Sequence, residues 1–157
     1  MIRPDQDVYF MHLARVVATR GECIRRRVGA VITDIQGRIL STGTNGVAPG
    51  HPPCIFKPCP GADAPSGTGL EECMASHAEI SALVYLPDPV VAHSIYVTAE
   101  PCISCVKAIS LTHIKRIIYM DPYPTNGRHL WDKEWSQIPE WRVNENTLQE
   151  KCRWKPV

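Results

Sequence analysis

The stretch SIYVTAEPCISCVKAISLTHIKRIIYM, residues 94–120, holds two short apolar segments on either side of a helix-like one. Residues 94–98 and 116–120 are rich in isoleucine, valine and tyrosine, which is typical of strands. The segment between them begins at Pro101, a residue suited to a first helical turn. We therefore predict a strand, a helix that begins near Cys102, and a second strand.

The segments upstream extend this pattern. Residues 5–19 place apolar side chains near helical spacing and end before Gly21, which predicts a helix. Residues 28–34 and 38–46 are two strand-like segments with a glycine between them, and we read them as a β-hairpin. A second apolar helix is expected over about 77–86.

The order strand, strand, helix, strand, helix, strand favours one mixed sheet covered by helices, an α/β layer fold. Ligands of such sheets bind near the carboxyl ends of strands, where helices begin. The sequences HAE at 77–79 and PCISC at 101–105 both fall at predicted helix starts. We expect a functional site where these two starts meet.

Composition restricts the classes of function. The chain has 157 residues, 44% of them hydrophobic and 21% charged, with a formal net charge of +1. These values predict one globular domain over 1–157 and no strongly basic surface for nucleic acid. No apolar run approaches the ~20 residues that cross a bilayer, and the acidic residues near the N-terminus do not fit a signal peptide. We therefore predict a cytoplasmic protein.

Seven cysteines are many for a reducing compartment, and the odd count without a secretion signal favours metal binding or catalysis. Three of them lie in a segment rich in proline and glycine over about 47–76, which we predict to be a long loop. Loops of this length are usually functional or tied down. The tail over about 121–157 contains all four tryptophans and shows no pattern that assigns a structure.

Cys102 and Cys105 are spaced to project to one side of a first helical turn, where the helix dipole favours thiolates. His77 opens the neighbouring helix and can supply a third ligand. Three protein ligands leave the fourth position of Zn²⁺ open, which is the catalytic pattern. Zinc lowers the pKa of bound water from about 15.7 to roughly 7, and Glu79 beside His77 can then carry protons.

The pattern H-x-E followed by P-C-x-x-C is the signature of zinc deaminases of nucleobases. Alone, the PCISC segment could be a redox pair or half of a structural zinc site, and HAE could occur by chance. Both halves are present in order, each at a predicted helix start. The sequence therefore favours one hydrolytic metal site.

Beyond these motifs, residues of about 8–123 resemble the deoxycytidylate (dCMP) deaminases, most closely in CIRRRVGAVITDIQGRILSTGTNG, HAEISAL and PCISCVKAISLTHIKRIIYMDPY. The resemblance implies a three-layer α/β/α sandwich with a mixed five-stranded sheet. It also implies hydrolysis of dCMP to dUMP with release of ammonia.

The same resemblance implies roles for individual residues. His77, Cys102 and Cys105 would bind the catalytic zinc, and Glu79 would carry protons. The residues expected at the substrate are Asn45 at the nucleoside, the Ala78 backbone N–H at the base, and Arg26, Arg27 and Tyr123 at the 5′-phosphate. Arginine suits phosphate because its guanidinium offers a planar pair of donors.

Members of this family often carry a second, structural zinc, which would order the long loop. The ligands expected here are Cys23, Cys54 and Cys73, with Cys59 preferred to His51 as the fourth. The alternative is a set of small buried thiols without metal.

The resemblance further implies a homo-oligomer, often a hexamer, in which dCTP or dTTP acts between subunits. Thr44 and Ser81 replace the aromatic residue and the asparagine usual in the family, so another cytosine nucleotide stays an alternative substrate. Deaminases of nucleosides or nucleic acid and a non-catalytic zinc-stabilised binding protein are further alternatives. The intact Glu79 argues against the last of these, because a structural site needs no unliganded carboxylate.

Overall fold

A mixed sheet of five strands is the centre of the computed structural model, which describes residues 4–65, 67–123 and 128–145. The strands are β1 Gly29–Thr33, β2 Ile39–Thr44, β3 Ser94–Ala99, β4 Arg116–Asp121 and β5 Glu134–Gln137. They lie in the order β2-β1-β3-β4-β5. β1 runs antiparallel to β2 and β3, whereas β3, β4 and β5 run parallel. The predicted hairpin and the two predicted later strands are confirmed.

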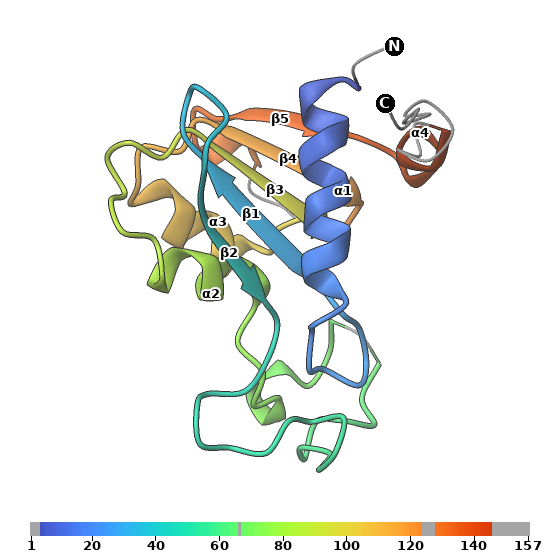
Figure 1. Ribbon diagram of the computed structural model, residues 1–157. Helices are drawn as coiled ribbons and strands as arrows, with labels where there is room; N and C mark the ends of the chain where they lie inside the picture. The colour runs from blue at the N-terminus through green and yellow to red at the C-terminus, as the bar shows by residue number, and fades with distance from the viewer. Residues whose placement is uncertain (1–3, 66, 124–127, 146–157) are drawn as a thin grey trace, which may run out of the picture.

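Helices cover both faces of this sheet (Figure 1). The helices are α1 Gln6–Ala18, α2 Ala78–Val84, α3 Ile103–Ser110 and α4 Glu140–Glu145. α1 and α4 share one core with one face of the sheet, and α2 packs with the other face. α3 contacts α2 on that second side. The three-layer α/β/α sandwich is confirmed, and the central strands β1 and β3 are buried throughout because both of their faces are covered.

Two glycines allow the helices to approach the hairpin closely. A Cβ on Gly29 of β1 would lie 2.2 Å from the backbone oxygen of Ala14 in α1. A Cβ on Gly43 of β2 would lie 2.2 Å from the backbone oxygen of Ala78 in α2. The hairpin therefore fixes the start of α2 by direct contact between backbones.

The parts without a sequence prediction are short or irregular. The tail contributes β5, α4 and a 3-10 turn, Arg128–Leu130, which the sequence pattern did not indicate. The predicted loop over 47–76 leaves the carboxyl end of β2, and the 3-10 turn Leu70–Glu72 lies within it (Figure 1). Trp154 and Cys152 of the tail lie outside the described residues. Within those residues, no helix combines the length and apolar character needed to cross a bilayer.

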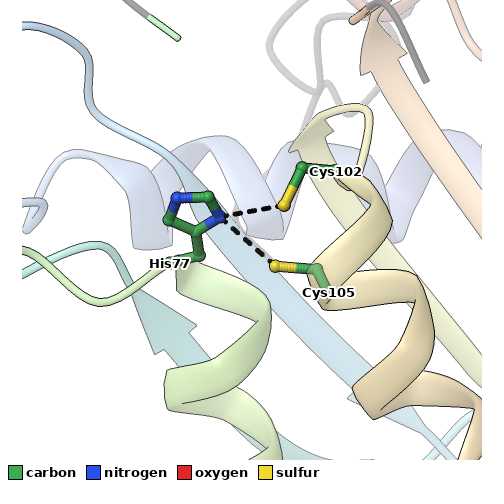
Figure 2. A group of neighbouring side chains, drawn as sticks. All are labelled: His77, Cys102 and Cys105. Atoms are coloured by element: carbon green, nitrogen blue, oxygen red, sulfur yellow. Dashed lines mark hydrogen bonds between the residues drawn. The ribbon is translucent and has the colours of Figure 1, made fainter. Parts of the chain in front are cut away.

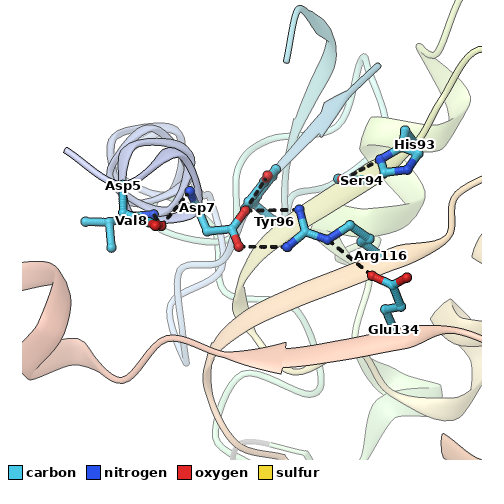
Figure 3. A network of polar contacts seen from close by, with 8 residues as sticks. All are labelled: Asp5, Asp7, Val8, His93, Ser94, Tyr96, Arg116 and Glu134. Carbon is cyan, nitrogen blue, oxygen red and sulfur yellow. Dashed lines mark hydrogen bonds and ion pairs between the residues drawn. The ribbon is translucent and has the colours of Figure 1, made fainter. Parts of the chain in front are cut away.

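A polar network joins the helix α1 to the sheet (Figure 3). Arg116 at the start of β4 donates to both carboxylate oxygens of Asp7, at 3.2 and 2.7 Å. The buried Tyr96 of β3 donates to the same carboxylate at 2.8 Å. These contacts lie at the amino end of β4, whereas α3 and its cysteines follow the carboxyl end of β3.

Candidate metal centre and substrate pocket

Two helix starts bring the predicted metal ligands together. His77 is the N-cap residue of α2, Cys102 is the N-cap residue of α3, and Cys105 lies in the first turn of α3. Figure 2 shows the imidazole pointing from α2 toward both sulfurs. The contact between α2 and α3 therefore assembles three ligands from segments that are 25 residues apart in the chain.

The distances between these atoms suit a zinc ion. His77 Nδ1 lies 3.3 Å from Cys105 Sγ and 3.5 Å from Cys102 Sγ, and all three ligand atoms lie within 4.8 Å of one another. Tetrahedral Zn²⁺ with ordinary bond lengths would separate its nitrogen and sulfur ligands by roughly 3.6 Å. One imidazole and two thiolates are also donors that zinc prefers. Among the described residues, His77, Cys102 and Cys105 form the one group of three or more possible metal ligands, and these are the three residues that the sequence predicted.

The pKa values of the two thiols and of the imidazole also favour the binding of a cation. A hydrogen bond between the two cysteines, supported by His77, lowers the pKa of Cys102 to about 4 against the effect of burial. The same hydrogen bond and burial raise the pKa of Cys105. The contact with Cys102 outweighs burial and raises the pKa of His77. These groups by themselves favour one thiolate, and a divalent cation among them would favour two.

Glu79 lies in the first turn of α2 and is 4% exposed. Burial raises the pKa of its carboxyl group more than the backbone hydrogen bond and the nearby His77 lower it. Glu79 is not among the three grouped ligands. A buried carboxyl group close to a metal site, with a raised pKa and no ligand role, has the properties of a proton carrier.

His77, Glu79 and Cys102 line one pocket together with most of the residues predicted for the substrate. Those predicted residues are Arg26, Asn45, Ala78 and Tyr123. Arg27 is exposed and is not among the lining residues, so the geometry favours Arg26 of the two candidate arginines.

The Asn45 side chain fixes the segment that carries these arginines. Its Oδ1 accepts a hydrogen bond from Val28 N at 2.7 Å, and its Nδ2 donates to Arg26 O at 2.6 Å. The Arg26 guanidinium in turn donates to Asp121 at the end of β4, at 2.7 Å. The direction of Arg26 therefore depends on contacts with Asn45, directly after β2, and with Asp121 of β4, which no local pattern encodes.

Two charged lining residues were missed by the sequence reasoning. Arg25 lines the pocket, and one of its guanidinium nitrogens donates to Thr68 O at 2.7 Å. Glu100 lines the pocket and is 3% exposed. A charged residue directly between a buried strand and the PCISC motif was the available signal for Glu100.

Among the described residues, the four cysteines predicted for a second metal do not come together in a group of three or more ligand atoms as His77, Cys102 and Cys105 do. Cys54 Sγ and Cys59 Sγ lie 3.7 Å apart, and both residues are buried. A backbone hydrogen bond from Met74 and side-chain hydrogen bonds with Cys54 and Cys73 lower the pKa of Cys59 against the effect of burial. Cys23 and Cys73 line the substrate pocket.

Comparison with known proteins gives consistent matches. Residues 4–121 match the family described as the cytidine and deoxycytidylate deaminase zinc-binding region. The deoxycytidylate deaminase of Mycobacterium phage D29 is 37% identical over 126 residues, which cover 76% of this chain and 97% of the relative. The deoxycytidylate deaminase of Schizosaccharomyces pombe is 35% identical over 126 residues, which cover 77% of this chain and 38% of the relative.

Solved structures confirm the fold. The dCMP deaminase from the cyanophage S-TIM5 in complex with dCMP and dUMP has a TM-score of 0.69 and 22% sequence identity. That similarity covers 88% of this chain and 100% of the other. The apo form of the same enzyme has a TM-score of 0.67.

Proposed function

Because the chain belongs to the cytidine and deoxycytidylate deaminase zinc-binding family, we infer that it catalyses the zinc-dependent hydrolysis of dCMP to dUMP and ammonia. One structural observation carries this inference. Three zinc-type ligand atoms lie together, and two of their residues, His77 and Cys102, line one pocket with Glu79, a buried carboxyl group outside the ligand group.

The residues that would hold Zn²⁺ are His77, Cys102 and Cys105. When bound, Zn²⁺ supplies the positive charge that lets water act as a nucleophile near neutral pH. Glu79 accepts the proton that this water loses on attack at C4 of the cytosine. It delivers that proton to N3. As the new hydroxyl at C4 becomes the carbonyl of dUMP, Glu79 takes the hydroxyl proton and passes it to the amine, whose bond to C4 breaks as ammonia leaves.

At the other groups of the nucleotide we propose Asn45 and the Ala78 backbone N–H as contacts of the nucleoside, with Arg26 and Tyr123 as contacts of the phosphate. All four residues line the pocket, which supports these roles.

We also propose a second, structural zinc at the Cys-rich loop. The contact between the Cys54 and Cys59 sulfurs, 3.7 Å apart, supports these two thiols as ligands, and Cys23 and Cys73 are the other candidates. The homo-oligomer, the regulation by dCTP or dTTP and the cytoplasmic location stay predictions.

The proposed activity is tested by ammonia release from dCMP, CMP, deoxycytidine, methylated dCMP and single-stranded DNA. We expect dCMP to give the highest kcat/KM. Ammonia from none of these compounds, with zinc-loaded protein, would remove the support for deamination.

The Glu79→Ala variant separates catalysis from a structural zinc site. We expect zinc content equal to that of the unmodified protein and kcat lower by about 10²–10⁴-fold, because the proton carrier is lost. An unchanged kcat would assign the carboxyl group no part in the reaction.

A further inference from the structure

Glu100 is a second buried carboxylate that lines the pocket, and it takes no part in the proton transfers proposed above for Glu79. It directly follows β3 and lies two residues before Cys102. Its side chain is 0% exposed. Since a buried charge is costly unless it is paired, the partners of Glu100 indicate what it does.

Both carboxylate oxygens of Glu100 are engaged. Oε2 accepts the backbone N–H of Tyr123 at 3.0 Å, and Oε1 accepts Nε of Arg128 at 2.6 Å. A second guanidinium nitrogen of Arg128 forms an ion pair with the same carboxylate. A carboxylate held on both oxygens is a fixed connection and not a mobile proton carrier.

Arg128 is itself anchored on the edge of the sheet. Its guanidinium lies 5.1 Å from the ring centroid of Tyr119 in β4 and 5.3 Å from that of Trp135 in β5. It also donates to the Tyr119 hydroxyl at 3.0 Å. Contact with two rings, together with the carboxylate and the hydroxyl as acceptors, leaves the guanidinium little freedom.

Tyr123 lies on the other side of Glu100 and lines the pocket. Its ring reaches the Cys-rich loop, since a Cβ on Gly67 would lie 2.8 Å from the Tyr123 hydroxyl. The backbone of Tyr123 is therefore tied to Glu100 at one end while its side chain meets the loop at the other. The hydrogen bond to Glu100 therefore fixes the position of Tyr123 in the pocket wall.

We propose that Glu100, held by Arg128, is a positioning residue that places Tyr123 in the pocket wall and thereby sets the affinity for the nucleoside monophosphate. The proposal rests on the proposed function, because it takes Tyr123 as a contact of the substrate phosphate. Glu100 acts through Tyr123 and does not touch the reacting atoms.

The first test compares Glu100→Gln and Arg128→Gln as zinc-loaded, full-length proteins. Glutamine in place of Glu100 keeps one acceptor oxygen for the two donors, so we expect KM for dCMP to rise about tenfold, or about 1.4 kcal/mol. We expect kcat to stay within about twofold and KM for deoxycytidine to be unchanged. Arg128→Lys keeps the positive charge but loses the planar arrangement of several N–H donors. It should give a smaller rise in KM for dCMP than Arg128→Gln.

The matched control is Arg15→Gln, which removes an arginine contact between α1 and α4 far from the pocket. It should leave both KM values unchanged.

Combination with Tyr123→Ala provides a further check. In that background Glu100→Gln should raise KM for dCMP by less than about twofold, because its effect passes through Tyr123.

The second test does not depend on activity. Hydrogen exchange of the Tyr123 amide, followed by NMR, should become at least about tenfold faster in Glu100→Gln, with zinc content unchanged. Unchanged exchange at Tyr123, or loss of zinc and kcat with a constant KM, would overturn the proposal. If the unmodified protein released no ammonia from dCMP, the proposed function would fail, whereas the exchange measurement would still decide whether Glu100 positions Tyr123.

Discussion

At the scale of single residues, two residues of the same type differ in role because their contacts and burial differ. Glu79 and Glu100 are both buried and line the same pocket. Glu100 has each oxygen on a fixed donor, whereas Glu79 lies beside the metal ligands with a pKa raised by burial. The same distinction separates Arg26, which lines the pocket, from Arg27, which is exposed outside it.

Arg26→Gln tests the phosphate contact. A hydrogen bond to a charged group contributes about 1.5–3 kcal/mol, so KM for dCMP should rise roughly 10–150-fold while that for deoxycytidine stays constant. Steady-state kinetics with both substrates measures the difference. Arg27→Gln should have a much smaller effect on KM for dCMP, and the opposite ranking would transfer the phosphate contact to Arg27.

At the scale of elements, α1 and α2 pack on opposite faces of the sheet, and a specific contact fixes where each of them begins. The start of α1 is held by Asp7, through Arg116 of β4 and Tyr96 of β3 (Figure 3). The start of α2 lies directly against Gly43 of β2. Only the second contact supports an element that carries site residues.

Asp7→Asn should lower the free energy of unfolding at pH 7 by about 2 kcal/mol, because Arg116 and Tyr96 lose a carboxylate acceptor. Burial would raise the pKa of Asp7, but hydrogen bonds from Arg116 and Tyr96 outweigh it and lower that pKa. The stabilisation is therefore complete above the unfolded-state pKa of about 3.9 and is lost as the pH falls through the lower folded-state value.

Urea denaturation at several pH values measures this effect. Asp7→Asn should make stability depend less steeply on pH below about pH 4. Glu134→Gln is the matched control, because this partner of Arg116 is 78% exposed and should contribute less than about 1 kcal/mol. An equal loss of stability in both variants would contradict the assignment.

Gly43→Ala and Gly29→Ala form a matched pair on opposite faces of the sheet. Each added Cβ meets a helix backbone at 2.2 Å, so each should destabilise by about 1–3 kcal/mol or more. Gly43→Ala displaces α2, whose N-cap is His77 and which carries Glu79, and should also weaken zinc binding and lower kcat. Gly29→Ala displaces α1 and should lower Tm alone. Equal kinetic effects would show that the two helices are not independent.

At the scale of the whole molecule, the Cys-rich loop and the catalytic centre share one pocket, because Cys73 and Gly67 line it with His77. Order in the loop therefore bears on the shape of the substrate site. A long segment with little apolar content cannot order itself by burial alone, which is the reason to expect a metal there.

Zinc analysis per chain tests this expectation. We expect two zinc ions per chain in the unmodified protein. Each of the variants Cys59→Ser and Cys102→Ser should contain one zinc ion per chain. Cys59→Ser should lower Tm by several degrees while keeping measurable activity, because it loses the structural ion. Cys102→Ser should lose activity with a smaller change in Tm. One zinc in the unmodified protein, unaffected by Cys59→Ser, would exclude the second site.

The hairpin, the strands on either side of PCISC, the helices that begin at HAE and PCISC, and the grouping of His77, Cys102 and Cys105 were predictable from the sequence alone. These features are local: apolar periodicity and the spacing of ligands at two helix starts are encoded within short segments. The three candidate ligands and Glu79, the proposed proton carrier, were named from 77–79 and 101–105 alone, and the structure brings the three ligand atoms within 4.8 Å of one another. The five-stranded sheet followed from family resemblance, because β5 is a short, partly exposed edge strand with a weak pattern.

Which arginine lines the pocket, and which groups hold Glu100, could be seen only in the folded chain. Arg26 is aimed by Asn45 and Asp121, which are 19 and 95 residues away in the chain. Glu100 acquires its role from Tyr123 and Arg128, whose segments have no regular periodicity. Such contacts join irregular segments across the sheet, and their geometry exists only once the strands have set the distances between them.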